Sequence, residues 1–461
     1  MEKKDNKALY EPKENKMGIM PVPKLLITMA APMIFSMLVQ ALYNVVDSFF
    51  VSRVHEDALT ALSLAFPIQN LMIAVSTGTG VGVNAMLSKS LGEGNRENVN
   101  KAAKNGIFLA ICSYVLFLLF GIFGTRPFME SQTDSVRIIE YGVQYLTICS
   151  VACLGIYIQI IFERLLQGTG KTFITMWTQL TGAIINIVLD PILIFGFFGL
   201  PALGVAGAAI ATVAGQIVAA IVAIICNLKF NKEIDFSFKG FRPDIKAIGR
   251  IYAVGFPSIL MVAISSIMTY TMNKILIGFT TTAVAVFGAY FKLQSFVFMP
   301  IFGLNNGMIP IVAYNYGARK RSRVTGTIKL SVAFAEAMMA VGVLIFQFFG
   351  KGLLISGFDA SETMVALGVP ALRIISLHFL LAGFCIISSS VFQALGNGVF
   401  SLLISFARQL LVLLPAAYLL SLSGRVEMVW WSFLIAEFAS LVLCSVFLRV
   451  TYNKKLKMLD A

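Results

Sequence analysis

Long apolar runs recur along almost the whole chain, and they restrict its fold more than any other feature of the sequence. Of the 461 residues, 58% are hydrophobic and only 13% are charged, whereas about a quarter of the residues in soluble domains are charged. A bilayer-spanning helix needs ~20 predominantly apolar residues, so the chain has room for about a dozen spans. The sequence therefore predicts an all-α integral membrane protein rather than a water-soluble fold.

Twelve transmembrane helices are predicted from these runs and from the loop signals between them. They start near Leu25, Ala58, Ala102, Val136, Phe173, Leu203, Ala247, Ala283, Gly326, Glu362, Val399 and Glu427. Together they occupy nearly all of the chain, so no large soluble domain is expected. The six cysteines lie in apolar runs without metal-binding spacing, which predicts neither a disulfide nor a metal cluster.

The net charge of +13 is concentrated between the apolar runs. Lys and Arg cluster before the first run and after the second, sixth, eighth and twelfth runs, and they are scarce in the odd-numbered connections. The positive-inside rule then places both termini and the even connections in the cytoplasm, in a cell (inner or plasma) membrane. Residues 1–24 lack the apolar core of a signal peptide and are predicted to remain as a tail. Anionic membrane lipid is the expected partner of the basic residues, and nucleic acid is not.

The two halves of the chain resemble each other weakly over several helices. One constant offset along the chain superimposes Pro32 on Pro257, Gln69 on Gln294, Gly78 on Gly303 and Gly92 on Gly317. An offset one position longer superimposes Gln167 on Gln393 and Gly170 on Gly396. An even number of helices separates the copies, so both halves enter the membrane in the same orientation, as a parallel repeat about an axis along the membrane normal.

This repeat predicts two pseudo-symmetric six-helix lobes. The predicted divisions are a tail at 1–24, an N-lobe at 25–228, a linker at 229–246, a C-lobe at 247–452 and a tail at 453–461. Pairs of bundles of this kind bind substrate between them near the bilayer midplane and expose it alternately on the two sides. Transport is therefore the leading functional prediction.

Two apolar runs each carry polar side chains at helical spacing. The first run has Ser36, Gln40, Asn44 and Asp47, and the fifth has Gln179, Gly182, Asn186 and Asp190. Steps of three and four residues place each set on one helix face. A carboxylate inside hydrocarbon costs roughly 2.5–3.5 kcal/mol on insertion scales, so Asp47 and Asp190 need polar partners or water.

The two stripes are predicted to face one cavity, to which Thr212 of the sixth run adds an oxygen. Carboxylate, amide and hydroxyl oxygens suit a hard cation such as Na+, and a buried carboxylate can instead hold a proton. A polar contact between packed helices, without a role in transport, explains the same pattern. Both interpretations follow from the residues alone.

Several of these segments resemble signatures of the MATE family of multidrug and toxic compound extruders. They are Pro32 followed by Asp47 in NVVDSFFVSR, the Gly-rich end of the second run with its LGEGN continuation, and NIVLD at 186–190. The resemblance extends from Pro32 to the twelfth run. Within the family, the chain is most similar to the bacterial MepA-type multidrug-export branch.

The resemblance implies a V-shaped pair of lobes that exports cationic and amphipathic organic compounds by antiport with H+ or Na+. It implies that the coupling ion, either a proton or a possible Na+, binds at Asp47, Asn186, Asp190 and Thr212. No other cofactor is expected. It also implies a bend of the first helix near Pro32, which agrees with the hydrogen bond that proline removes from a helix.

The C-lobe departs from one pattern of the family. Some members carry acids in the seventh and tenth spans, but near those places this chain has Ser265 and Ala382. Cation coupling is therefore predicted to depend on the N-lobe.

Seven further ionisable residues fall within apolar runs: Glu163, Arg164, Lys292, Glu336, His378, Arg408 and Glu437. Glu163 and Arg164 are predicted to extend toward the cytoplasmic interface. Arg408 and Glu437 are predicted to form a buried pair that only fixes packing. His378 is expected to make a helix contact rather than to relay protons.

The predicted substrate cavity combines polar, aromatic and Met side chains, because flexible Met beside aromatic rings accommodates varied apolar cations. Its candidates are Gln40, Tyr43, Asn44, Met72, Gln179, Tyr290, Lys292 and Met299. Lys292 would repel cationic substrates or pair with an acid. A monomer is expected.

Three other functions compete with export. A flippase of lipid-linked saccharides has a related architecture but usually lines its cavity with several Arg or Lys, which are few within these runs. The composition also permits a channel. An enzyme lacks support, because no nucleophile and base are paired. Gly170-Lys171-Thr172 ends like a phosphate-binding loop, but Leu165 occupies the position of its first Gly, so no nucleotide is expected.

Overall fold

The computed structural model describes residues 15–52, 56–358 and 360–460, and every regular element within these ranges is helical. Within these ranges, ten helices are long and apolar enough to cross a membrane. Two further pairs of helices, bent by 45° and 50°, bring the number to twelve when each pair is one span. The all-α, multi-pass membrane fold predicted from the sequence is confirmed.

The first six spans form the N-lobe. Its helices are α2 (Val22–Ser52), α3 (Glu56–Gly92), α4 (Arg96–Phe123), the pair α6 (Val136–Val151) and α7 (Leu154–Gly168), α8 (Thr172–Phe195) and α9 (Val205–Phe230). Three short helices accompany them: α1 (Lys16–Ile19), α5 (Thr125–Glu130) and η1 (Phe197–Gly199).

The last six spans form the C-lobe. Its helices are α10 (Ile245–Ile277), α11 (Thr281–Gly317), α12 (Arg321–Phe358), the pair α13 (Glu362–Ser376) and α14 (Phe379–Ala394), α15 (Gly398–Phe406), η2 (Ala407–Leu413), α16 (Leu414–Ser421) and α17 (Val426–Thr451). The chain continues into η3 (Tyr452–Leu456) and η4 (Lys457–Asp460). All twelve predicted span starts fall within six residues of the observed ones.

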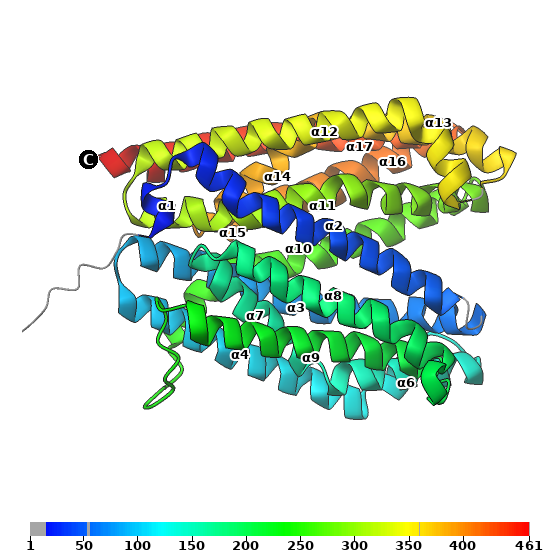
Figure 1. Ribbon diagram of the computed structural model, residues 1–461. Coiled ribbons are helices and arrows are strands. Elements are labelled where there is room, and N and C mark those ends of the chain that lie inside the picture. Colours follow the sequence, from blue (N-terminus) through cyan, green and yellow to red (C-terminus); the bar gives the residue numbers. More distant parts are fainter. Residues whose placement is uncertain (1–14, 53–55, 359, 461) are drawn as a thin grey trace, which may run out of the picture.

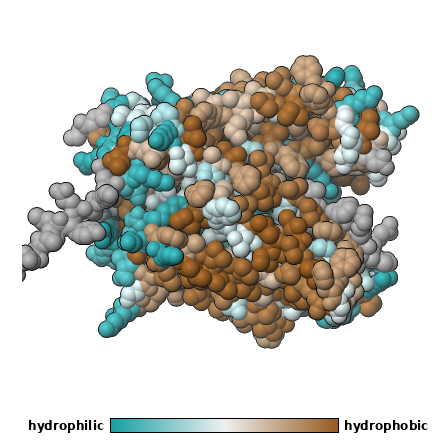
Figure 2. All heavy atoms as spheres, viewed as in Figure 1, coloured by the Kyte–Doolittle hydropathy of each residue, from teal (hydrophilic) through white to brown (hydrophobic). Residues whose placement is uncertain are grey.

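The helices lie roughly parallel in a bundle whose two ends are polar. Figure 1 shows α1, the end of α17 and the 231–244 connection at the same end of the bundle. Figure 2 shows hydrophobic residues over the middle of the visible face and hydrophilic residues gathered toward the ends. This distribution matches a protein whose middle lies in hydrocarbon.

The two bent spans lie at equivalent places of the repeat. The break between α6 and α7 falls at Ala152 and Cys153, and the break between α13 and α14 falls at Leu377 and His378. The offset that superimposes Pro32 on Pro257 also superimposes these two breaks. A helix interruption at membrane depth is tolerated where protein or a cavity surrounds it. The repeat therefore extends to a backbone irregularity that the hydrophobic pattern does not reveal.

The lobes meet through small residues of four helices. Gly78 of α3 lies against Gly255 and Ile259 of α10, so closely that an added Cβ would be 2.8 Å from the Gly255 carbonyl oxygen. In the same way, Gly303 of α11 lies against Ile34 of α2, whose Cα would be 2.5 Å from an added Cβ. Small residues allow helix backbones in membranes to approach each other this closely.

A third contact lies at the ends of α3 and α11. A Cβ on Gly92 would be 1.9 Å from the carbonyl oxygen of Tyr314, and a Cβ on Gly317 would be 2.2 Å from that of Lys89. Gly92 and Gly317 are equivalent positions of the repeat, and so are Lys89 and Tyr314. The two helices therefore make the same contact twice, once in each direction across the pseudo-symmetry axis.

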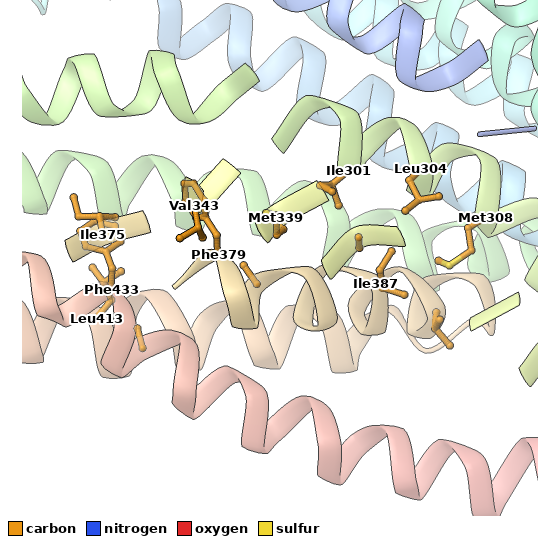
Figure 3. Packing of buried hydrophobic residues seen from close by; sticks show 14 of the residues in the cluster. Ile301, Leu304, Met308, Met339, Val343, Ile375, Phe379, Ile387, Leu413 and Phe433 are labelled. Carbon is orange, nitrogen blue, oxygen red and sulfur yellow. The ribbon is translucent and has the colours of Figure 1, made fainter. Parts of the chain in front are cut away.

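The hydrophobic cores also join the lobes. The largest core cluster contains mostly C-lobe residues, but it includes Leu25, Leu26 and Met29 from the start of α2. An N-lobe cluster likewise includes Ala247 and Ile251 from the start of α10. Figure 3 shows buried side chains of α11, α12, α14 and α17 packed together in the first of these clusters.

The short helix α1 connects the lobes at one end of the bundle. The Asn15 amide donates to the backbone oxygen of Thr169 in the N-lobe at 3.0 Å. On the other side, Asn315 and Arg323 of the C-lobe each donate to the backbone oxygen of Met17 at 2.9 Å, and Met17 is fully buried. Burial, together with the positive charge of Lys171, lowers the pKa of Lys16.

Removal of the Arg323 guanidinium is expected to weaken the attachment of α1 to the C-lobe. Arg323 donates to the backbone oxygens of Met17 and Met20 at 2.9 and 2.7 Å, and hydrogen bonds from charged donors contribute about 1.5–3 kcal/mol. Arg323→Ala should therefore increase the rate of tryptic cleavage after Lys16 by about tenfold or more, measured by mass spectrometry. Lys329→Ala is the control, because Lys329 is exposed on α12 and makes no hydrogen bond to α1 within the described part of the chain. Equal cleavage rates in the two variants would contradict the contact.

Candidate functional site

Two helices of the N-lobe, α8 and α9, bring part of the predicted cation site together. An added Cβ on Gly215 of α9 would lie 2.7 Å from the carbonyl oxygen of Gly182 on α8, so the backbones almost touch at this level. Next to this contact, the Asn186 amide donates to the Thr212 hydroxyl at 3.3 Å. Asn186 is buried and Thr212 is half-buried.

Asp190 lies one helical turn after Asn186 and is fully buried. The amide oxygen of Asn186 is buried without a hydrogen-bond partner among the described residues. Asn186 and Thr212 thus bring an amide and a hydroxyl group together, and Asp190 adds a buried carboxylate one turn further along α8. The side chains of Asp47 and Asn44, the remaining members of the predicted set on α2, lie outside the described residues.

The polar faces of α2 and α8 meet at Ser36 and Gln179. The Ser36 hydroxyl donates to the side-chain oxygen of Gln179, and Ser36 is buried. Both residues belong to the two stripes predicted from the sequence. Asp47 is eleven residues after Ser36, and Asp190 is eleven residues after Gln179. Figure 1 shows α2 and α8 running in the same direction.

Glu163 of α7 lies at the centre of a buried network that the sequence did not reveal. Its Oε1 accepts hydrogen bonds from Gln159 at 3.0 Å and from Thr178 at 3.2 Å, and its Oε2 accepts one from Gln179 at 2.8 Å. Only 4% of Glu163 is exposed, so the prediction that it extends to the cytoplasmic interface is wrong. Three amide and hydroxyl donors hold the side chain inside the lobe instead, because a buried carboxylate requires them.

Arg164 links the lobes rather than reaching the interface. Its Nη1 donates to Gln167 of its own helix and to Asn306 of α11, both at 2.8 Å. Gly80 leaves space for this side chain, since an added Cβ there would lie 2.8 Å from Cγ of Arg164. One hydrogen bond of this guanidinium therefore depends on how the two lobes are placed relative to each other.

The other predicted substrate-cavity residues do not form one group. Gln40 and Tyr43 are half-buried on α2, and Met72 is buried in an N-lobe core cluster. Tyr290 is fully buried among aromatic side chains of the C-lobe, with Phe433 at 6.0 Å between ring centroids. Lys292 is exposed. Met299 lines a cavity of the C-lobe with a volume of about 300 Å3.

The ion pair predicted between Arg408 and Glu437 is present, with Glu437 buried and Arg408 half-buried. Nη1 of Arg408 lies 3.2 Å from Oε2 of Glu437, and 3% of the Glu437 side chain is exposed against 30% of the Arg408 side chain. Both residues line the same C-lobe cavity, as does Ser265. His378 is buried and makes a 2.5 Å hydrogen bond through Nδ1 to the Ile375 backbone oxygen, as expected of a helix contact. Ala382 is fully buried.

Comparison with known proteins identifies relatives along most of the chain. The model of the family described as MatE matches residues 32–192 and 257–419, one segment in each lobe. The multidrug export protein MepA of Staphylococcus haemolyticus is 27% identical over 419 residues, covering 90% of both chains. The protein of the same name from Staphylococcus aureus strain N315 is 25% identical and covers 90% of this chain and 91% of its own.

Solved structures share the fold. One, described as the outward-facing conformation of a multidrug resistance MATE family transporter of the MOP superfamily, superimposes with a TM-score of 0.90 over 97% of this chain and 99% of its own, at 23% identity. Another, from a MOP superfamily transporter of Pyrococcus furiosus, gives a TM-score of 0.88 at the same coverage and identity. The arrangement of two repeated lobes is therefore common to these proteins.

Proposed function

Because the chain belongs to the MATE family, we propose that it exports cationic and amphipathic organic compounds by antiport with H+ or Na+, through a coupling site at Asp47, Asn186, Asp190 and Thr212. Export of drug-like compounds is inferred from relatives that are named multidrug export proteins. Both termini are proposed to be cytoplasmic, since α1 and the end of α17 lie at the end of the bundle that carries the basic connections.

The proposal of a coupling site rests on the cluster of polar residues on α8 and α9, namely Asn186, Asp190 and Thr212. Asn186 and Asp190 are 3% and 0% exposed, yet neither has a hydrophobic side chain. Ionisable groups inside membranes mark ion pathways by default, because burying them is costly. The contact of Ser36 with Gln179 aligns α2 with α8, and the equal eleven-residue steps bring positions 47 and 190 to a similar height along the two helices.

A buried carboxylate at this site can bind either the organic cation or the coupling ion, and antiport requires that the two exchange. Deprotonated and empty, it attracts an organic cation; protonated or occupied by Na+, it no longer does. Drug and coupling ion then compete for one negative charge. Alternating exposure of that charge converts the ion gradient into export.

Dye efflux from proteoliposomes with imposed gradients tests this function. Purified protein is reconstituted with ethidium and driven separately by a pH gradient and by a Na+ gradient. We expect one gradient, but not an equal electrical potential alone, to drive ethidium movement. Ethidium movement at the same rate without any ion gradient would contradict coupled antiport. Movement of a lipid-linked saccharide but of no dye would favour a flippase.

A further inference from the structure

The two ends of the described chain are bonded at equivalent places of the repeat. Asn15, the residue before α1, donates its side-chain N–H to the backbone oxygen of Thr169 at 3.0 Å. Lys455 of η3 donates to the backbone oxygen of Leu395 at 2.7 Å. The longer of the two offsets of the repeat superimposes Thr169 on Leu395. Each of these residues ends the second half of a bent span, where helix carbonyls need partners from outside the helix.

Of these two contacts, the one made by Asn15 joins the lobes. The η3 segment continues α17, so the bond from Lys455 to Leu395 stays inside the C-lobe. Asn15 instead reaches the N-lobe from a segment that the C-lobe holds. Backbone oxygens of residues 17, 18 and 20 accept hydrogen bonds from three C-lobe side chains, which are Asn315, Lys320 and Arg323. Figure 1 shows α1 at the end of the bundle that also carries the end of α17.

The chain that follows α1 is also packed on the C-lobe. Leu25, Leu26 and Met29 of α2 are fully buried in the core cluster that consists mostly of C-lobe residues. α1 and the first turns of α2 therefore form one unit with the C-lobe. On the N-lobe side, α1 touches the turn at residues 169–170, through the hydrogen bond of Asn15 and through Cε of Lys16, which would lie 3.2 Å from a Cβ added to Gly170. When the lobes separate at this end, this contact is the one that breaks.

Charge opposes this contact. Lys16 is half-buried, and its ammonium group lies close enough to that of Lys171 for the two positive charges to repel each other. Glu233 neutralises part of the charge of Lys171, because its Oε2 lies 2.5 Å from Nζ of Lys171. The hydrogen bond of Asn15 is therefore offset by the burial and repulsion of an ammonium group. Since the net gain from one hydrogen bond is only about two- to tenfold in an equilibrium, the contact is readily reversible.

The attachment of α1 to the C-lobe lies directly beside the point where the lobes meet. Asn315, which donates to the backbone oxygen of Met17, follows Tyr314 in α11. Tyr314 provides the backbone oxygen that Gly92 of α3 approaches most closely. Any movement that separates α3 from α11 at this level also pulls α1 away from the N-lobe turn at residues 169–170. The two contacts therefore open and close together.

We propose that α1 is a latch that holds the lobes together at this end of the bundle, and that its contact with residues 169–170 must break each time this end opens. The C-lobe is the fixed side of the latch, and the N-lobe turn is the side that releases. The inference rests on the proposed function, because alternating exposure requires this end to open. The latch sets the ratio of closed to open protein, and it does so without the coupling ion.

Amide hydrogen exchange of the purified full-length protein, without substrate or gradient, tests the latch. Asn15→Ser keeps a side-chain acceptor for the first turn of α1, but its shorter side chain does not reach Thr169. We expect exchange to become roughly two- to tenfold faster in residues 16–20 and also at the contact of the lobes, in residues 89–92 and 314–317. Faster exchange in residues 16–20 alone would show a docked chain end that does not hold the lobes. That result, or unchanged exchange in all three segments, would overturn the proposal.

A second substitution should act in the opposite direction. Lys16→Met keeps an apolar side chain against Gly170 and removes the charge that Lys171 repels, so exchange should become slower in the same three segments. Exchange that is equal to or faster than that of the parent would contradict the balance on which the latch depends. The control is Asn453→Ser, the same change as Asn15→Ser at an exposed residue of η3, which should leave exchange at the contact of the lobes unaltered.

Asp190→Asn separates this inference from the proposed function. It removes the proposed coupling charge and should lose efflux, but adding Asn15→Ser to it should speed exchange as in the parent protein. Efflux that persists in Asp190→Asn would contradict the coupling site alone. Exchange that does not respond to Asn15→Ser in either background would contradict the latch alone.

Discussion

Asp190→Asn is expected to abolish gradient-driven dye efflux while the protein still folds and inserts. Asn has nearly the same shape as Asp and keeps hydrogen-bonding groups toward its surroundings, but it can neither bind a proton at physiological pH nor supply a negative charge. Asp190 is fully buried on α8, one turn after Asn186, so the substitution removes a negative charge from the interior of the N-lobe. Efflux of ethidium from proteoliposomes should fall to the level of protein-free vesicles.

The matched control for this substitution is Asp134→Asn. Asp134 is exposed in the connection between α5 and α6, so the same chemical change should leave efflux unaltered. Asp47→Asn should behave like Asp190→Asn if both acids serve one site. Undiminished efflux in both Asp47→Asn and Asp190→Asn would remove the basis of the proposed coupling.

Gly92→Ala is expected to impair transport by preventing α3 and α11 from closing on each other. The new Cβ would lie 1.9 Å from the Tyr314 carbonyl oxygen, which is backbone and cannot rotate away. Overpacking of this kind costs about 1–3 kcal/mol, enough to shift the equilibrium between closed and open arrangements by roughly five- to 150-fold. Efflux should fall, and amide hydrogen exchange should become faster near residues 89–92 and 314–317.

Gly249→Ala on α10 controls for the change of residue type. An added Cβ at Gly249 meets no atom within 4 Å, and Ala is the better helix former, so this variant should be at least as stable as the parent. Gly317→Ala, the pseudo-symmetric counterpart of Gly92→Ala, should reproduce its effect. Normal efflux and exchange in Gly92→Ala would show that the contact is not needed in the transport cycle.

The sequence predicted the number and limits of the spans because hydrocarbon imposes a length on every apolar run. It did not predict the breaks at Ala152 and at Leu377. Neither break contains the Pro or Gly that usually signals one, so the bends depend on packing with neighbouring helices. The π-helical turn at Arg408 was also missed, although Pro415 follows it by two residues and lacks the N–H that a regular helix would use there.

The contacts of Ser36 with Gln179 and of Asn186 with Thr212 agree with the predicted stripes, because helical periodicity fixes which residues share a face. The Glu163 network was missed because its donors come from two helices and a single sequence does not show how deep a side chain lies. Gln159 and Glu163, four residues apart on α7, were the available signal. The C-lobe cavity draws on several elements, so no single stripe marked it.

The helices α2 and α10 each belong to one lobe yet are packed against the other, which limits how the protein can change shape. If either helix moved with its own lobe as a rigid rod, it would lose its packing contacts with the other lobe. Pro32 lies between Ala30 and Ile34, which face α11, and Pro257 lies between Gly255 and Ile259, which face α3. Proline lacks the N–H that makes a helix hydrogen bond, so we expect α2 and α10 to bend most easily at Pro32 and Pro257. We propose that any rocking of the lobes is taken up as paired bending of α2 and α10 at these two prolines.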